Sequence, residues 1–182
     1  MTDTPNVRLY GMNDAVDVDN GSTESSPESV TPLDTFSTAA SSAIASAAEV
    51  AAARDRSTIT CEDLFVAMLA DPDSAATRLL QSLDFSAIDL VRQIQFILGE
   101  PRQPAGSLPA ERSPRLTECI EMAGLEAAKW HAPEVQTTHL LVGILRERRG
   151  LASLVLETPG IGLEPVGAIL SRAIRDQVTD HP

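Results

Sequence analysis

Apolar residues recur every three or four positions along most of the chain, the spacing that places them on one face of an α-helix. The clearest stretch is QTTHLLVGIL at 136–145, and a degenerate copy, TCEDLFVAML, lies 76 positions earlier at 60–69. At that offset, and without a gap, ten residues meet an identical partner, mostly at apolar positions: Ser37/Ser113, Ile44/Ile120, Ala47/Ala123, Ala51/Ala127, Ala52/Ala128, Leu64/Leu140, Val66/Val142, Leu69/Leu145, Ala76/Ala152 and Leu80/Leu156. The pattern predicts a tandem helical repeat. A chance match between two helices rich in alanine and leucine is the alternative.

Capping residues and helix breakers divide each repeat into four predicted helices. In repeat one, 33–98, we expect helices from Ser37 to about Arg54, from Thr60 to the Asp-Pro-Asp at 71–73, from about Asp73 to Ser82, and from Ser86 to Leu98. Thr60 with Asp63, and Ser86 with Asp89, have the spacing of a capping box.

A linker and a second set of four helices complete the pattern. Residues 99–112 hold three prolines and two glycines, which indicates a linker. Ser113 followed by Pro114 is a favourable helix start, because proline has no N–H to leave unpaired there. In repeat two, 113–178, the helices should run from 113 to about 131, 137 to 147, 150 to 157 and 163 to 178.

The predicted fold class is all-α, a tandem pseudo-two-fold repeat of two four-helix units. Aromatic residues make up only 3% of the 182 residues, so aliphatic helix faces must fill the core, and we expect no sheet in it. The length suits one domain, at 33–182. Residues 1–32 are rich in Asp, Asn, Ser, Thr, Gly and Pro, and we expect them to form a disordered acidic tail.

Charge restricts the partners. The net charge is −12, and residues 1–34 carry half of it, with seven acids against Arg8 alone. This balance opposes phosphate backbones and anionic lipid, so we expect no nucleic-acid and no membrane partner. No apolar stretch approaches the ~18 residues of a membrane span, and the start lacks a basic segment before an apolar run. These features favour a cytoplasmic protein, which we expect to be a monomer.

Catalytic and metal chemistry have little support. Cys61 and Cys119 occupy different places in the repeats, form no CxxC motif, and are expected to be small buried thiols. The three histidines lack metal-ligand spacing, and a Cys119 nucleophile would need a positioned base and an oxyanion pocket. We therefore expect no enzyme, no cofactor and no metal. Trp130 should pack between helices.

The order Ser-Pro-Arg at 113–115, an alanine-rich helix and then TTHLLVGIL at 137–145 resembles the Clp amino-terminal repeat domain, whose signature is T-P-R-A followed by G-T-E-H-L-L-L-G-L-L, twice in tandem. The first copy is similar too, with Phe36-Ser37 for the family's F-T, Glu62 for the Glu of G-T-E-H, and 86–92 for S-L-E-x-V-R. The resemblance covers 33 to about 178.

The resemblance implies a protein-binding function. In the family this domain precedes AAA+ unfoldase rings and receives adaptors and substrates of the Clp protease. No G-x-x-x-x-G-K-[ST] string occurs in this chain, so we expect a free-standing domain that acts as an adaptor, decoy or sequestering protein. The alternative is a repurposed helical scaffold or regulatory protein unrelated to Clp.

The resemblance also implies candidate ligand sites. Family members hold phosphorylated arginine through the Thr or Ser that begins the first helix, which suits phosphate, and the Glu of G-T-E-H, which suits the guanidinium. Carried over by repeat, the first site is Ser37 with Glu62. The second is Ser113 with Thr138, where threonine replaces the Glu, so at most one site should be competent. The alternative roles are N-caps for the serines and favourable charge near a helix N-terminus for Glu62.

Actinobacterial members bind cyclic peptides between the repeats through two aromatic residues. The corresponding positions, Leu33 and Arg112, are not aromatic. This difference argues against that ligand and indicates that the partner surface has changed.

Overall fold

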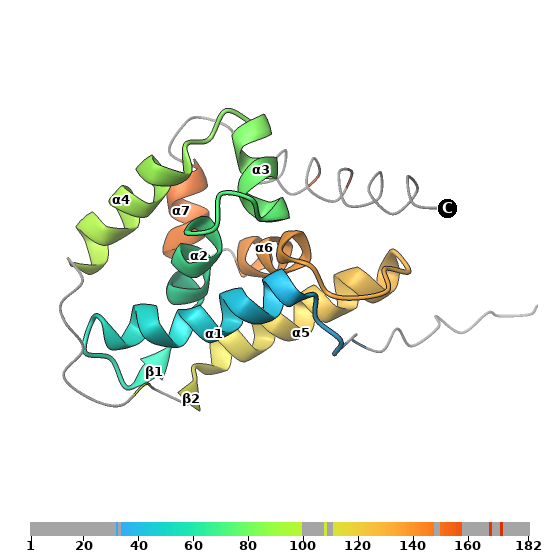
Figure 1. The fold of residues 1–182 in the computed structure, drawn as a ribbon, viewed down its shortest axis with the longest axis horizontal. Coiled ribbons are helices and arrows are strands. Elements are labelled where there is room, and N and C mark those ends of the chain that lie inside the picture. Colours follow the sequence, from blue (N-terminus) through green and yellow to red (C-terminus); the bar gives the residue numbers. More distant parts are fainter. Residues whose placement is uncertain are drawn as a thin grey trace, which may run out of the picture.

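The computed structural model describes residues 34–99, 111–147 and 150–157, with the single residues 32, 108, 168 and 172. Leu33, nearly all of the predicted tail, most of the linker and most of the eighth predicted helix lie outside these residues. The described chain forms α1 (Thr38–Ala52), β1 (Thr58–Ile59), α2 (Cys61–Leu69), α3 (Ala75–Ser82), α4 (Ala87–Leu98), β2 (Glu111–Arg112), α5 (Pro114–Lys129), α6 (Thr137–Arg146) and α7 (Leu151–Glu157) (Figure 1). The predicted all-α class is confirmed.

The helices begin where local capping chemistry predicts. The hydroxyls of Ser37 and Ser113 each accept a hydrogen bond from the backbone N–H three residues later, at 3.2 Å. The Asp63 carboxylate accepts from the Thr60 N–H at 2.9 Å, as a capping box requires. The third helix starts slightly later than predicted. Ser74 is its N-cap, because its hydroxyl can accept from the Thr77 N–H at 3.1 Å.

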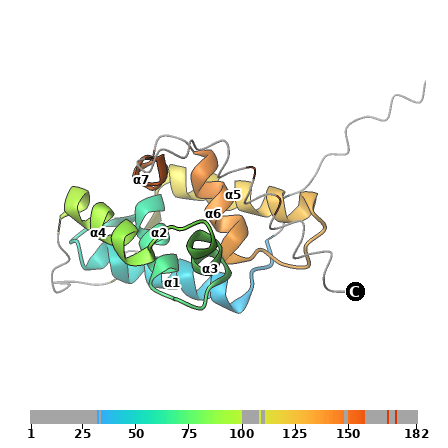
Figure 2. The same cartoon turned by 90° about the horizontal axis from the view of Figure 1, so that it is seen from above.

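Helices α2 and α6 form the centre of the domain (Figures 1 and 2). Every residue of α2 and all of α6 except Arg146 are buried. Helix α1 packs on α2, and α5 packs on α6. The buried stripe of α1 is made of alanines, and α6 has Gly143 against α5. Small side chains at these contacts allow close approach of the helices.

The expectation of no sheet was wrong in detail. Strands β1 and β2 form a two-stranded parallel pair in which Ile59 lies opposite Arg112, and an isolated bridge joins Phe36 to Val135. The extended segments that enter the helices run beside one another, and their backbone groups need hydrogen-bond partners. The offset of 76 maps Phe36 onto Arg112 and Ile59 onto Val135. The two contacts are therefore equivalents, as a two-fold relation between the halves requires.

No helix in the part of the chain that the structure describes is both long enough and apolar enough to cross a bilayer.

Candidate binding sites at the two repeat junctions

The β1–β2 pair and the Phe36–Val135 bridge form two equivalent junctions between the repeats. At the first, the Ser113 N–H donates to the Ile59 carbonyl at 2.9 Å, so the start of α5 lies beside the start of α2. At the second, the Ser37 N–H donates to the Val135 carbonyl at 3.0 Å, so the start of α1 lies beside the start of α6. Each junction thus combines helix starts from different repeats.

The first junction contains an ion-paired arginine, and we call it the Arg115 site. Nε and Nη2 of Arg115 donate to the two carboxylate oxygens of Glu147 at 2.8 and 2.6 Å. Nη2 also lies 3.8 Å from Glu62 Oε1. The bonds to Glu147 raise the pKa of Arg115 above its ordinary value. The guanidinium is therefore held in the two-point geometry that arginine prefers with carboxylates.

Glu62 is largely enclosed within the Arg115 site. It is only 7% exposed, and besides facing Arg115 its carboxylate accepts a hydrogen bond from the Leu151 N–H, at the start of α7, at 3.3 Å. Glu62 thus already has a guanidinium partner from its own chain.

Two thiols meet in the core beside the Arg115 site. The Sγ atoms of Cys61, on α2, and Cys119, on α5, are 3.2 Å apart, and both residues are buried. The contact with Cys119 and burial raise the pKa of the Cys61 thiol. The sequence predicted buried thiols but not their meeting.

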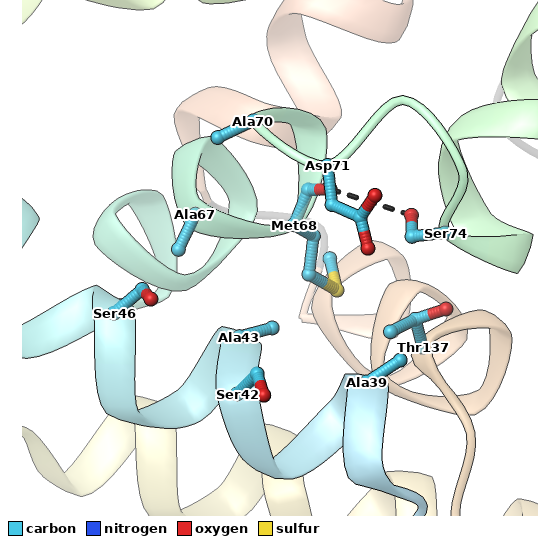
Figure 3. A pocket seen from close by; sticks show the side chains of 10 residues that line it. All are labelled: Ala39, Ser42, Ala43, Ser46, Ala67, Met68, Ala70, Asp71, Ser74 and Thr137. Carbon is cyan, nitrogen blue, oxygen red and sulfur yellow. Dashed lines mark hydrogen bonds between the residues drawn. The ribbon is translucent and has the colours of Figure 1, made fainter.

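The second junction has a pocket of about 250 Å³ in place of an ion pair, and we call it the Asp71 pocket (Figure 3). Its walls come from the outer face of α1, the end of α2, the α3 cap and the start of α6: Ala39, Ser42, Ala43, Ser46, Ala67, Met68, Ala70, Asp71, Ser74 and Thr137. Most of these side chains are small, and Asp71 is the charged residue among them.

The repeat offset relates the pocket to the Arg115 site. It maps Ala39 onto Arg115, Asp71 onto Glu147 and Ser74 onto Gly150. Two other lining residues, Ala43 and Thr137, correspond through the same offset to Cys119 and Cys61. The second junction therefore keeps a carboxylate but has alanine where the first has its arginine.

The structure regroups the site residues predicted from the sequence. The order of the repeats predicts one site from Ser37 with Glu62 and another from Ser113 with Thr138. Because the helix starts pair across the repeats, Glu62 lies on the helix beside Ser113, and Thr138 lies on the helix beside Ser37. Both serine hydroxyls act as N-caps, and Thr138 is buried.

The remaining predicted positions are simpler to place. Arg112 is exposed in β2, and Leu33 lies outside the described residues. His139 is buried, and its Nδ1 accepts from the Gln136 N–H at 2.9 Å. Trp130 ends α5 and donates through Nε1 to Glu126 at 2.8 Å. Among the described residues, no group of three or more His, Cys, Asp or Glu side chains could hold a metal ion.

Arg115, Glu147 and Asp71 are candidate site residues that the sequence motifs did not predict. A signal for them was present, because the offset that pairs identical residues also pairs Arg115 with Ala39 and Glu147 with Asp71. Only the fold shows that these positions face one another.

Comparison with known proteins identifies the repeat. The profile of the Clp repeat (R) N-terminal domain family matches residues 35–158. The ATP-binding subunit ClpC of the ATP-dependent Clp protease from Staphylococcus saprophyticus is 27% identical over 131 residues, and ClpC from Staphylococcus aureus strain USA300 gives the same figures. The match covers 72% of this chain but only 16% of either relative.

Solved structures with the same fold extend over most of the chain. The N-terminal domain of the chaperone ClpD from Arabidopsis thaliana has a TM-score of 0.61 at 15% identity, covering 79% of this chain and 96% of that domain. The Hsp104 N-terminal domain from Candida albicans has a TM-score of 0.62 at 16% identity, covering 75% and 89%. These identities establish a shared fold, and the profile match over 35–158 establishes the family: the chain belongs to the Clp repeat (R) N-terminal domain family.

Proposed function

We propose that this chain is a non-catalytic protein-binding module of Clp proteolysis, acting on substrates or adaptors as an adaptor, decoy or sequestering protein. The observation that carries the proposal is the family match, which spans both repeats and relates the chain to the ClpC subunit of a protease. The two junctions support it, because each presents a charged or hollow site between the repeats.

A degradation assay tests this proposal. The full chain is added to a reconstituted Clp unfoldase and protease that degrades a fluorescent substrate. An adaptor accelerates degradation, whereas a decoy or sequestering protein slows it in a way that excess substrate relieves. If the rate is unchanged and the chain captures neither the unfoldase nor its substrates, the proposal fails and the unrelated scaffold is favoured.

Within this function we propose phosphorylated arginine as a ligand of the Arg115 site. Glu62 beside the start of α5 supplies a carboxylate for a guanidinium, and the positive end of the α5 dipole together with the Ser113 hydroxyl suits a phosphate. Because Arg115 already faces Glu62 at 3.8 Å, the ligand must displace it.

Removal of the carboxylate charge tests the ligand. We expect Glu62→Gln to abolish binding of a phosphorylated-arginine peptide, since the guanidinium loses its partner. Glu118→Gln, on the exposed surface of α5, should bind like the wild type. Equal binding by Glu62→Gln and the wild type would remove phosphorylated arginine as a ligand of this site.

A further inference from the structure

We propose that the Asp71 pocket binds the side chain of an unmodified arginine from a basic polypeptide. The inference deepens the proposed protein-binding function and rests on it. It assigns to the second junction a ligand different from the one proposed for the Arg115 site.

The chain itself indicates which group fits this position. In the equivalent place of the other repeat, Arg115 lies against α6 and binds Glu147 through two hydrogen bonds of 2.8 and 2.6 Å. At the second junction the carboxylate is present as Asp71, but the arginine is replaced by Ala39. The pocket therefore lies where a guanidinium side chain is bound in the other half of the same molecule.

The size of the pocket agrees with this occupant. A volume of about 250 Å³ is sufficient for the seven heavy atoms of an arginine side chain, since even at the ~30 Å³ that a separate water occupies they would need roughly 210 Å³. Ala39, Ala43 and Met68 supply apolar wall for the methylene stem, which arginine commonly packs against apolar surface. Asp71, which is exposed, lies beside Ser74 in the lining (Figure 3).

The hydrogen-bonding groups of the wall leave Asp71 as the charged acceptor for a ligand, beside the hydroxyls of Ser42 and Ser46. The Thr137 hydroxyl accepts from the Ala76 N–H at 3.2 Å, and the Ser74 hydroxyl is engaged with Thr77 and with the Met68 carbonyl. Asp71 is exposed, and one of its oxygens accepts from the Asp73 N–H at 2.9 Å. A carboxylate oxygen accepts more than one hydrogen bond, so Asp71 retains capacity for a guanidinium.

Electrostatics favours an unmodified arginine over the alternatives. A phosphate on the guanidinium would bring negative charge to Asp71, and lysine lacks the planar fork that binds a carboxylate at two points. The net charge of −12 attracts basic segments from a distance. The positive N-termini of α1 and α6 oppose a cation in the pocket. Arg115 also lies in the first turn of a helix, α5, and the carboxylate of Glu147 nevertheless binds it there. A carboxylate can therefore outweigh the unfavourable helix dipole.

An NMR titration of the full ¹⁵N-labelled chain tests the proposal. The probe is a Gly/Ser peptide with one central arginine, compared with versions that carry citrulline, lysine or phosphorylated arginine. We expect the arginine peptide to bind the Asp71 pocket tightest, with the affinity read from the amide signals of Ala39, Ser42 and Thr137. Citrulline has the shape of arginine without its charge, so its binding should be weaker by roughly tenfold.

Two pairs of variants locate the site. Asp71→Asn should weaken the arginine peptide by roughly tenfold, whereas Asp73→Asn, on the same exposed loop, should not. Ala39→Arg should abolish binding, because the new side chain fills the pocket as Arg115 fills its own site. Ala45→Arg, exposed on α1 outside the pocket, should bind normally.

The outcomes separate this inference from the proposed function. Equal binding of the arginine and citrulline peptides, an unchanged affinity in Asp71→Asn, or tighter binding of phosphorylated arginine than of arginine as read from the signals of Ala39, Ser42 and Thr137 would overturn the pocket assignment. If the wild type modulates Clp degradation while the arginine peptide leaves the signals of Ala39, Ser42 and Thr137 unshifted, the proposed function stands and the inference fails. If the wild type has no effect on degradation but binds arginine through Asp71, the inference stands and the proposed function fails.

Discussion

Replacement of Gly143 by alanine should destabilise the domain, although alanine is the better helix former. Gly143 lies within α6, and a Cβ added there would come 2.2 Å from the Cys119 carbonyl oxygen and 3.3 Å from the Ala123 nitrogen. Both atoms belong to the backbone of α5. No side-chain rotation can relieve such a contact, so the two helices must separate.

The expected loss is the difference between two terms. Alanine in place of glycine favours a helix by about 1 kcal/mol. An extra carbon in a packed interface costs typically ~1–3 kcal/mol, and the upper end applies here because backbone must move. The net loss is then about 2 kcal/mol, which for a chain of this size lowers Tm by roughly 4–8 °C.

Circular dichroism during thermal and urea unfolding of the full chain measures this change. Ala67→Gly is the matched control, since the repeat offset maps Ala67 onto Gly143 and Ala67 is buried on α2. The control creates no clash and should lose about 1 kcal/mol through helix propensity. A Gly143→Ala protein as stable as the wild type, or more stable, would refute the close approach of α5 and α6.

Two further predictions concern buried titratable groups. Burial lowers the pKa of His139 to about 4, so between pH 6.5 and 4 the unfolded chain binds more protons. The free energy of unfolding should therefore fall by about 1.4 kcal/mol for each unit that the pH is lowered in this window. Free energies from urea unfolding should show this slope in the wild type and in the exposed-site variant His131→Asn, but not in His139→Gln. Cys61 and Cys119 are each 2% exposed, and the contact with Cys119 together with burial raises the pKa of the Cys61 thiol. Ellman's reagent at pH 8 should therefore react at least tenfold faster with the chain in urea than with the native chain, and equal rates would contradict the burial of the thiols.

Helix boundaries could be predicted from the sequence because they depend on local chemistry. Ser37, Thr60 and Ser113 each accept or organise hydrogen bonds within the next three residues, and such contacts follow from spacing alone. The repeat offset also predicted which positions are equivalent. It could not show which equivalents face one another.

The residues that meet across the repeats could not be placed from the sequence. Arg115 is 53 positions from Glu62 and 32 from Glu147, and apolar periodicity carries no information on such distances. The order of the repeats along the chain pairs Ser37 with Glu62. The parallel pairing of β1 with β2, which the sequence did not indicate, is what places Glu62 beside the start of α5 instead.

The backbone explains how two equivalent junctions can carry different chemistry. The bonds from Ser37 to Val135 and from Ser113 to Ile59 join backbone atoms, so they persist whatever side chains surround them. Arg115 could therefore be matched by Ala39, and Glu62 by Thr138, without loss of the fold. One junction holds an arginine of its own, whereas the other has the carboxylate without an arginine, which is the state in which a site is open to the arginine of another polypeptide.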